Sequence, residues 1–345
     1  MKKAIAAVMS AVMLAFGAAA FAACENGGSD VVTLQSYNSE SQIVALLQQA
    51  QNSGAEAYGV LGEPSLTNGK AEVSSISVAV DFQEEWTAIT EFDGYPQASL
   101  IARGTFAQSD PAFIAAFSEA LKDNASWLSQ EENIDKFEQK LAAYNAVDPD
   151  GYQTTLAGKT YTTETIANCN LGYQSAQEVK ASVKDYVNRL SGSEPADGFF
   201  YAAPASGAQA QAEGDKTVDV YLPDGTPAFA LAKVFTEGVS VAGYTVRFHI
   251  VAAGQIGTIF SSTAGTEAEA DLAVMPTIGA ANVYAKAGGI QLVSTHVFGN
   301  LYIASVNGTA DSLEDLRGKT VYTTAATTIQ LLQYLLTANG IEYTV

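Results

Sequence analysis

The 345-residue chain is poor in several residue types that build metal centres and cross-linked scaffolds. It has two cysteines and two histidines, which excludes a disulfide-rich scaffold and a histidine-rich metal site. Lys and Arg together number 17 against 37 Asp and Glu, so the formal net charge is −20. Nucleic acids and anionic lipid surfaces are bound through clustered Lys and Arg. The composition therefore argues against both as partners.

The first 23 residues have the layout of an export signal, and we predict a signal peptide over 1–23. Lys2 and Lys3 precede an apolar, Ala-rich run, and small residues crowd just before Cys24. The run is close to the roughly 20 residues that span a bilayer, so an uncleaved anchor is the competing interpretation. Residues 24–30 are expected to form a short polar tether.

The segment AFAAC, which ends at Cys24, resembles a bacterial lipobox, with Phe21 where Leu is usual. This resemblance implies that Cys24 is lipidated, with simple cleavage as the alternative. The protein is then expected outside the cell, anchored to the outer face of the cytoplasmic membrane or on the periplasmic side. A lipidated Cys24 leaves Cys169 without a disulfide partner, and we expect Cys169 to be a small buried thiol rather than a nucleophile.

Strand-like and helix-like segments alternate along the remaining chain. Its length of about 320 residues is enough for two domains with large cores. Helices are predicted from Pro111, with Asp110 as N-cap, and over 132–146 and 176–190. The strand-like runs are VVTLQSY, AEAYGVLGEP, VSSISVAVDF, PQASLIAR, VDVYL, TVRFHIV, DLAVMP, IQLVSTH and KTVYTT. This alternation is typical of α/β domains whose largely parallel sheets are covered by helices.

Residues 202–215 are rich in Ala, Gly, Ser and Gln and have few large apolar side chains. We predict a flexible linker here. A coil of this length has a root-mean-square reach of about 20 Å.

Several segments carry a resemblance to a known family. The run from Asp271 to Ala304 and the later SLEDLRGKTVYTT are similar to solute-binding lipoproteins of bacterial ABC importers. The branch is the type II periplasmic-binding-protein family, which includes nitrate, sulfonate and thiamine-precursor binders. The likeness extends to GVLGEP (59–64), GYPQASLIAR (94–103) and residues 167–202, and so covers nearly all of the mature chain.

The order of these segments departs from the family. Its members run from the VDVYLPDGTP strand through GKTVYTT, then VVTLQSY, GVLGEP and GYPQA, and end with the tail found here at 167–202. The chain therefore resembles a circular permutation, with the usual end near Ala202 joined to the usual start near Lys216. Such a change is tolerated where the old ends meet at a surface and the new cut falls in an exposed turn. A misassembled or artificially reordered record is the alternative.

The resemblance implies a two-lobed fold in which two chain crossings form a hinge, near Phe92 to Tyr95 and near Ser305. Residues 93–305 would build one lobe, and 31–92 together with 306–345 the other. Such lobes close over a ligand. The implied partners are a small molecule and an ABC transporter permease, with membrane attachment through lipid. We expect a monomer, with no cofactor and no metal.

In open α/β sheets, ligands bind beyond the carboxyl ends of strands and beside helix N-termini. Four loops match that description, and their hydroxyls and free N–H groups are suited to a carboxylate, sulfonate or phosphate. Ordinary helix capping is the alternative for each. The candidates in these loops are Thr226 and Pro227, Thr277 and Gly279, Thr324, Thr327 and Thr328, and Ser39 and Ser41.

Four further side chains are candidates of other kinds. Glu63 would bring a carboxylate suited to an amine, amidine or hydroxyl, with a solvated loop acid as the alternative. His296 is placed in a loop after a strand, where it lines the cleft or is structural. Tyr95 and Tyr37 are expected to stack on a flat ligand or to pack. Together these groups indicate a small polar ligand with an anionic part and an aromatic or heterocyclic part.

No motif for catalysis is present. The chain lacks a GxSxG elbow, an HExxH pair and a phosphate loop that ends in Gly-Lys-Ser or Gly-Lys-Thr. We therefore predict a binding protein without catalytic residues. One alternative is a related enzyme of thiamine- or menaquinone-precursor synthesis, which the export signal disfavours because those enzymes are cytosolic. Another is a surface lipoprotein with no role in transport.

Overall fold

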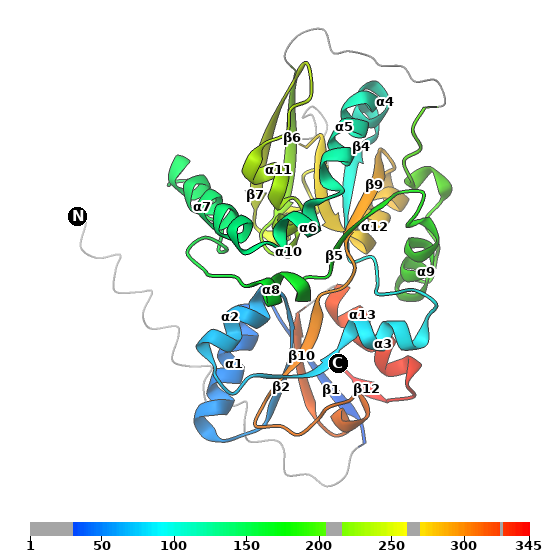
Figure 1. The fold of residues 1–345 in the computed structure, drawn as a ribbon. Coiled ribbons are helices and arrows are strands. Elements are labelled where there is room, and N and C mark those ends of the chain that lie inside the picture. The colour runs from blue at the N-terminus through cyan, green and yellow to red at the C-terminus, as the bar shows by residue number, and fades with distance from the viewer. Residues whose placement is uncertain (1–29, 205–215, 261–269, 325–326) are drawn as a thin grey trace, which may run out of the picture.

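The structure is a computed structural model that describes residues 30–204, 216–260, 270–324 and 327–345. The predicted signal peptide, Cys24 and most of the predicted linker lie outside these residues. Two six-stranded sheets lie one above the other, with helices on their faces (Figure 1). The prediction of an α/β fold is confirmed.

The first sheet combines the two ends of the chain. Its strand order is β12-β1-β11-β2-β10-β3. Strand β1 pairs in parallel with β11 and β12, and β11 in parallel with β2, whereas β10 is antiparallel to both β2 and β3. The strands are β1 (Val32–Tyr37), β2 (Ala57–Gly62), β3 (Ser77–Asp81), β10 (Leu301–Val306), β11 (Thr320–Thr324) and β12 (Tyr343–Thr344).

Helices cover both faces of the first sheet, which explains why β2 and β10 are buried along their whole length. Side chains alternate between the faces of a strand. In β2, Leu61 packs with Ile43 and Leu47 on one face, and Val60 belongs to the cluster of α13 on the other. The covering helices are α1 (Glu40–Ser53) and α2 (Ser65–Glu72) on the first face, and α3 (Phe82–Ile89) and α13 (Thr327–Ala338) on the second.

The second sheet has the order β5-β9-β4-β8-β6-β7. Strands β7, β6 and β8 pair in parallel, whereas β4 is antiparallel to β8 and β9, and β5 is antiparallel to β9. Both sheets are thus mixed, and the prediction of largely parallel sheets is wrong for this one. The strands are β4 (Ala98–Arg103), β5 (Leu171–Ser175), β6 (Lys216–Pro223), β7 (Tyr244–Val251), β8 (Leu272–Pro276) and β9 (Ile290–Val297).

Helices also cover both faces of the second sheet, and alternate residues of β4 face them. Leu100 packs with α5, α7, α10 and α11, while Ile101 belongs to the cluster of α9 and α12. The helices are α4 (Gly104–Ser109), α5 (Pro111–Leu121), α6 (Asn124–Leu128), α7 (Glu131–Val147), α8 (Thr163–Asn168), α9 (Lys180–Ser191), α10 (Thr226–Ala230), α11 (Ala232–Glu237) and α12 (Thr277–Ala287). Asp110 is the N-cap residue of α5 as predicted, but its carboxylate binds Lys216 and Tyr244 instead of capping.

The chain passes between the sheets twice, through residues 90–97 and 298–300, and the two crossings run side by side. The backbone N of Gln97 donates to the carbonyl of Val297 at 2.9 Å, and the backbone N of Asn300 donates to the Gln97 side chain at 2.9 Å. Gly94 has φ +76°, and a Cβ there would lie 2.3 Å from the Phe298 carbonyl oxygen. The second crossing therefore precedes β10, and the predicted boundary at Ser305 is wrong because β10 belongs to the first sheet.

The beginning and the end of the described chain are neighbours in the first sheet. Val32 pairs with Tyr343, and the backbone N of Val32 donates to the carbonyl of Glu342 at 2.9 Å. Both ends of the folded chain therefore lie at one edge of one sheet.

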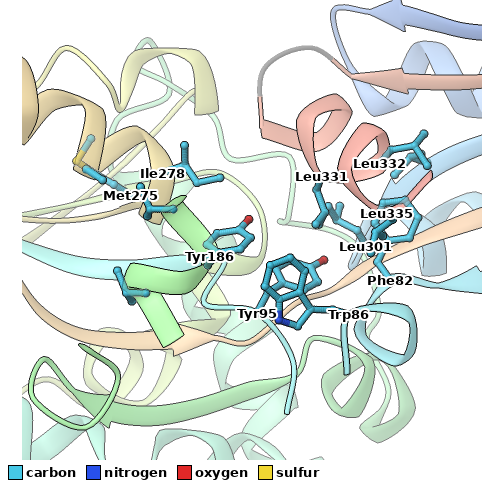
Figure 2. Packing of buried hydrophobic residues seen from close by; sticks show 14 of the residues in the cluster. Phe82, Trp86, Tyr95, Tyr186, Met275, Ile278, Leu301, Leu331, Leu332 and Leu335 are labelled. Carbon is cyan, nitrogen blue, oxygen red and sulfur yellow. The ribbon is translucent and has the colours of Figure 1, made fainter. Parts of the chain in front are cut away.

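An aromatic cluster packs beside the first crossing, between helices of the two sheets (Figure 2). Trp86 of α3 contacts Tyr186 of α9 edge-on, with ring centroids 5.3 Å apart, and Tyr95 of the crossing stacks on Tyr186 at 5.6 Å. Leucines of α13 complete the same cluster. Arg189 of α9 also donates to the Tyr334 hydroxyl of α13 at 2.5 Å. This cluster joins the two halves away from their sheet edges.

Candidate ligand-binding site

A cavity of about 460 Å³ is lined by residues of both sheets. Loops that follow β1, β2 and β11 line it from the first sheet, and loops that follow β6, β7 and β8 from the second. The crossings contribute Gln97 and Asn300. The cavity thus lies at the carboxyl ends of parallel strands, where α/β sheets commonly bind ligands.

Eight of the twelve residues predicted to bind a ligand line this cavity. They come from four loops that are far apart in the sequence and that the fold brings together. They are Ser39, Ser41, Glu63, Thr226, Pro227, Thr324, Thr327 and Thr328. Ser39 is the N-cap residue of α1 but makes no capping hydrogen bond through its side chain. The alternative of ordinary side-chain capping therefore does not apply to Ser39.

Thr277 and Gly279 do not line the cavity. The Thr277 hydroxyl is fully buried and shares a hydrogen bond of 2.8 Å with Ser99, which also bonds Thr295 at 2.7 Å. The first turn of α12 therefore faces the sheet, and Pro276 takes the position at the cavity.

His296 and Tyr95 are core residues. His296 lies within β9 rather than in a loop, and its Nε2 is 2.8 Å from the Ser294 hydroxyl. Burial lowers the pKa of His296 to about 3, so its imidazole is neutral. Tyr95 is fully buried and donates to Gln83 at 3.1 Å. The expectation that either lines the cleft is wrong.

Stacking on a flat ligand has no support from the lining. Tyr37 packs edge-on against Tyr322, with ring centroids 5.7 Å apart, and it does not line the cavity. Over residues 30–204, 216–260, 270–324 and 327–345, the lining includes no Phe, Tyr or Trp.

Glu63 is a buried acid that links both halves, and the alternative of a solvated loop acid is wrong. Its side chain and backbone together are 3% exposed. The carboxylate accepts from the Thr67 backbone N at 3.1 Å and from Asn168 Nδ2 at 3.4 Å. Burial raises the pKa of Glu63, and these hydrogen bonds oppose the shift. Its backbone carbonyl accepts from Asn300 Nδ2 at 3.0 Å and from the Thr226 hydroxyl.

Glu40 is a second acid at the cavity that sequence reasoning missed. It stands in the first turn of α1, and its Oε1 accepts from the backbone N of Gly62 at 2.9 Å. Burial raises its pKa; hydrogen bonds from Ser65 and Gly62 oppose the shift, and the nearby charge of Glu63 adds to it. An acid in a first helical turn is usually explained by the helix dipole alone. The sequence therefore carried only a weak signal.

Asn300 is a buried amide at the cavity, and sequence reasoning also missed it. Its Nδ2 faces the Glu63 carbonyl, and this orientation is required because a carbonyl only accepts. Its Oδ1 is buried and has no hydrogen-bond partner among the described residues. A buried acceptor left without a donor costs about 1–3 kcal/mol.

Asp224 is the third lining carboxylate, and protein donors already surround it. It accepts from the Thr155 backbone N and hydroxyl at 2.8 Å each, and from the Tyr152 hydroxyl at 2.9 Å. The described part of the lining has no Lys, Arg or His to balance Glu40, Glu63 and Asp224. The cavity is therefore acidic, which disfavours the predicted anionic ligand part.

In the part of the chain that the structure describes, few groups are suited to metal binding or to nucleophilic catalysis. No group of three or more His, Cys, Asp or Glu side chains there is arranged to hold a metal ion. Cys169 is buried, and burial raises the pKa of its thiol well above the ordinary value. No helix among the described residues has both the length and the apolar character to cross a membrane. Comparison with protein-family models and with curated proteins gives no match for this chain.

Proposed function

We propose that this protein is an extracytoplasmic solute-binding protein that captures a small polar molecule and delivers it to an ABC import permease. One observation carries the proposal: a cavity of about 460 Å³ lies where strand ends of two sheets meet. That size falls in the range of ligand sites, about 300–1,000 Å³. Hydroxyls and amides line it from both sides, together with three carboxylates and apolar side chains.

The two crossings are suited to a hinge. The first lobe is defined as the first sheet with α1–α3 and α13, and the second lobe as the second sheet with its helices. Residues 90–97 and 298–300 are the two direct connections between these sheets. Because the connections run side by side, rotation about them would open the cavity with little change inside either lobe.

Polar contacts between the lobes around the cavity differ in their burial. Thr67 of the first lobe donates to Thr165 of α8 at 3.3 Å, and Lys159 lies 3.7 Å from Glu72. The Lys159–Glu72 pair is exposed and contributes little to stability in water. Asn168 and Thr226 of the second lobe also donate to Glu63 of the first, so opening would break these hydrogen bonds, and a ligand that contacts both lobes would favour the closed arrangement.

Export and anchoring rest on the sequence. The predicted signal peptide and the lipobox-like segment before Cys24 support export and a lipid tether to the membrane, and we expect a monomer. Expression of the full chain with labelled fatty acid tests this step. Label should enter the wild type and not a Cys24→Ala variant, and equal labelling of both would contradict it.

A binding screen tests the central proposal. Thermal stability of the chain from residue 30 is measured against amines, amino acids, sulfonates, nitrate and thiamine precursors. Hits are followed by calorimetry and by analysis of the recovered ligand. A solute-binding protein should bind one chemotype at one molecule per chain and return it unchanged. Recovery of a chemically altered product would support an enzyme instead, and the absence of any binding would contradict the proposal.

A further inference from the structure

The charge of the cavity limits the chemical class of ligand that it is suited to bind. Glu40, Glu63 and Asp224 line it, and no Lys, Arg or His does so among the described residues. A ligand anion would approach these carboxylates without a compensating cation, which is unfavourable in a partly buried site. Asp224 already accepts from four donors of residues 152–155. Glu40 and Glu63 are therefore the carboxylates left to act on a ligand.

A second observation points to a hydrogen-bond donor on the ligand. Asn300 lines the cavity and is 3% exposed, and its Oδ1 has no hydrogen-bond partner in the described chain. Its Nδ2 is held by Glu63 and Thr226, so the amide is not free to turn Oδ1 toward a protein donor. A ligand N–H that reaches Oδ1 would satisfy an acceptor that is otherwise costly to bury.

Glu40 and Asn300 converge on the same point of the chain. A methyl group placed on Gly62 would lie 3.3 Å from Glu40 Oε1 and 3.6 Å from Asn300 Nδ2. The carboxylate of Glu40 and the amide of Asn300 thus flank the end of β2. Both polar groups therefore lie at the part of the cavity where β2 ends.

We infer that this cavity recognises an aliphatic ligand whose cationic end carries N–H donors, such as a primary amine or an amidinium group, held by Glu40, Glu63 and Asn300. The inference rests on the proposed function and names its ligand class. Quaternary ammonium ligands are recognised mainly by aromatic cages. The described lining has no aromatic side chain, so an N–H cation is favoured over a quaternary one.

Matched probes test the inference by calorimetry. The amine arm is agmatine, putrescine and glucosamine. The comparison arms are choline for the quaternary cation, gluconate and nitrate for anions, and hydroxymethylpyrimidine for a flat ring. Binding confined to the amine arm is the expected result. Tighter binding of any comparison probe overturns the inference and leaves the proposed function standing, whereas failure of every arm overturns both.

A variant pair tests the residues. Glu40→Gln keeps an oxygen acceptor for Gly62 and removes only the charge, so affinity for the bound amine should fall about tenfold to 100-fold. Glu84→Gln is the control, because Glu84 is an exposed acid that also stands in the first turn of a helix, α3, away from the cavity. Its affinity should equal that of the wild type.

Glu63→Gln provides an independent variant of the same kind. It keeps the acceptor for Thr67 and should weaken amine binding in the same direction as Glu40→Gln. Equal affinity in the wild type and both cavity variants would remove these carboxylates from recognition and overturn the inference, even where an amine binds.

Discussion

The Thr226 hydroxyl donates a hydrogen bond to the backbone carbonyl of Glu63, 163 positions away in the sequence. This contact joins the first turn of α10, beside the second sheet, to the loop after β2 of the first sheet. Asn300, in the second crossing, donates to the same carbonyl at 3.0 Å. One peptide group thus links segments of both sheets and of a crossing at the wall of the cavity.

Thr226→Val should lower the free energy of unfolding by about 1–2 kcal/mol, because it removes a buried donor while keeping the side-chain shape. Urea unfolding measures the effect. Thr337→Val is the matched control: the Thr337 hydroxyl also donates to a backbone carbonyl, that of Gln333, but it is exposed and local. Its change should stay within about 0.5 kcal/mol. An equal loss of unfolding free energy in the two variants would show that the hydrogen bond between Thr226 and Glu63 contributes no more than an exposed, local one.

Trp86 should be shielded from solvent, because it is fully buried against Tyr95 and Tyr186. The chain has two tryptophans, so Trp127→Phe isolates its emission. We expect blue-shifted fluorescence that acrylamide quenches poorly until the protein unfolds. The reciprocal Trp86→Phe leaves Trp127, which is partly buried and donates through its indole N–H to the exposed side chain of Glu237. Acrylamide should quench its emission more readily than that of Trp86. Similar quenching in both variants would contradict the burial of Trp86 against Tyr95 and Tyr186.

His296 should make stability fall in mild acid. Burial lowers its pKa from 6.5 to about 3. Below about pH 6.5 the imidazole is therefore protonated in the unfolded chain and still neutral in the folded chain. The free energy of unfolding should then decrease by up to about 1.4 kcal/mol per pH unit. Glu40 and Glu63 act in the opposite direction, because burial raises their pKa and their contribution is lost as pH rises above 4.5.

Urea unfolding at several pH values separates these effects. His296→Leu removes the imidazole and should flatten the loss of stability between about pH 6.5 and pH 5. An identical slope in the wild type and this variant would show that His296 is not the group that titrates.

A rearranged chain should fold. Val32 and Tyr343 are neighbours in the first sheet, so a short Gly–Ser linker is able to join Val345 to Val31. New ends are opened between Pro204 and Lys216, the described residues that flank the predicted linker. We expect a thermal midpoint within a few degrees of the parent, measured by circular dichroism. A second rearranged chain, opened between Ser294 and Thr295 inside the buried strand β9, should not fold. If neither rearranged chain folds, the result contradicts the position of β1 beside β12 in the first sheet.

Local patterns in the sequence were sufficient for the kinds of element and for where loops follow strands. The predicted helix over 132–146 matches α7, and the helix that begins at Pro111 matches α5. Serines and threonines at helix starts were placed correctly beside the cavity where the loop faces the other sheet. These features depend on residues a few positions apart, and such spacing is visible in the chain itself.

Only the tertiary structure decided which side chains reach the cavity. His296 and Tyr95 have the residue types of a binding site, yet strand register and helix packing draw both into the core. Glu40 and Asn300 had weak signals or none. Both lie near Gly62 because β10 pairs with β2 and the loop after β1 reaches the end of β2, although the two residues are about 260 positions apart in the sequence. The direction of β4 and β10 was likewise set by the crossings. Contacts between distant segments depend on how the sheets assemble, and local periodicity does not encode that assembly.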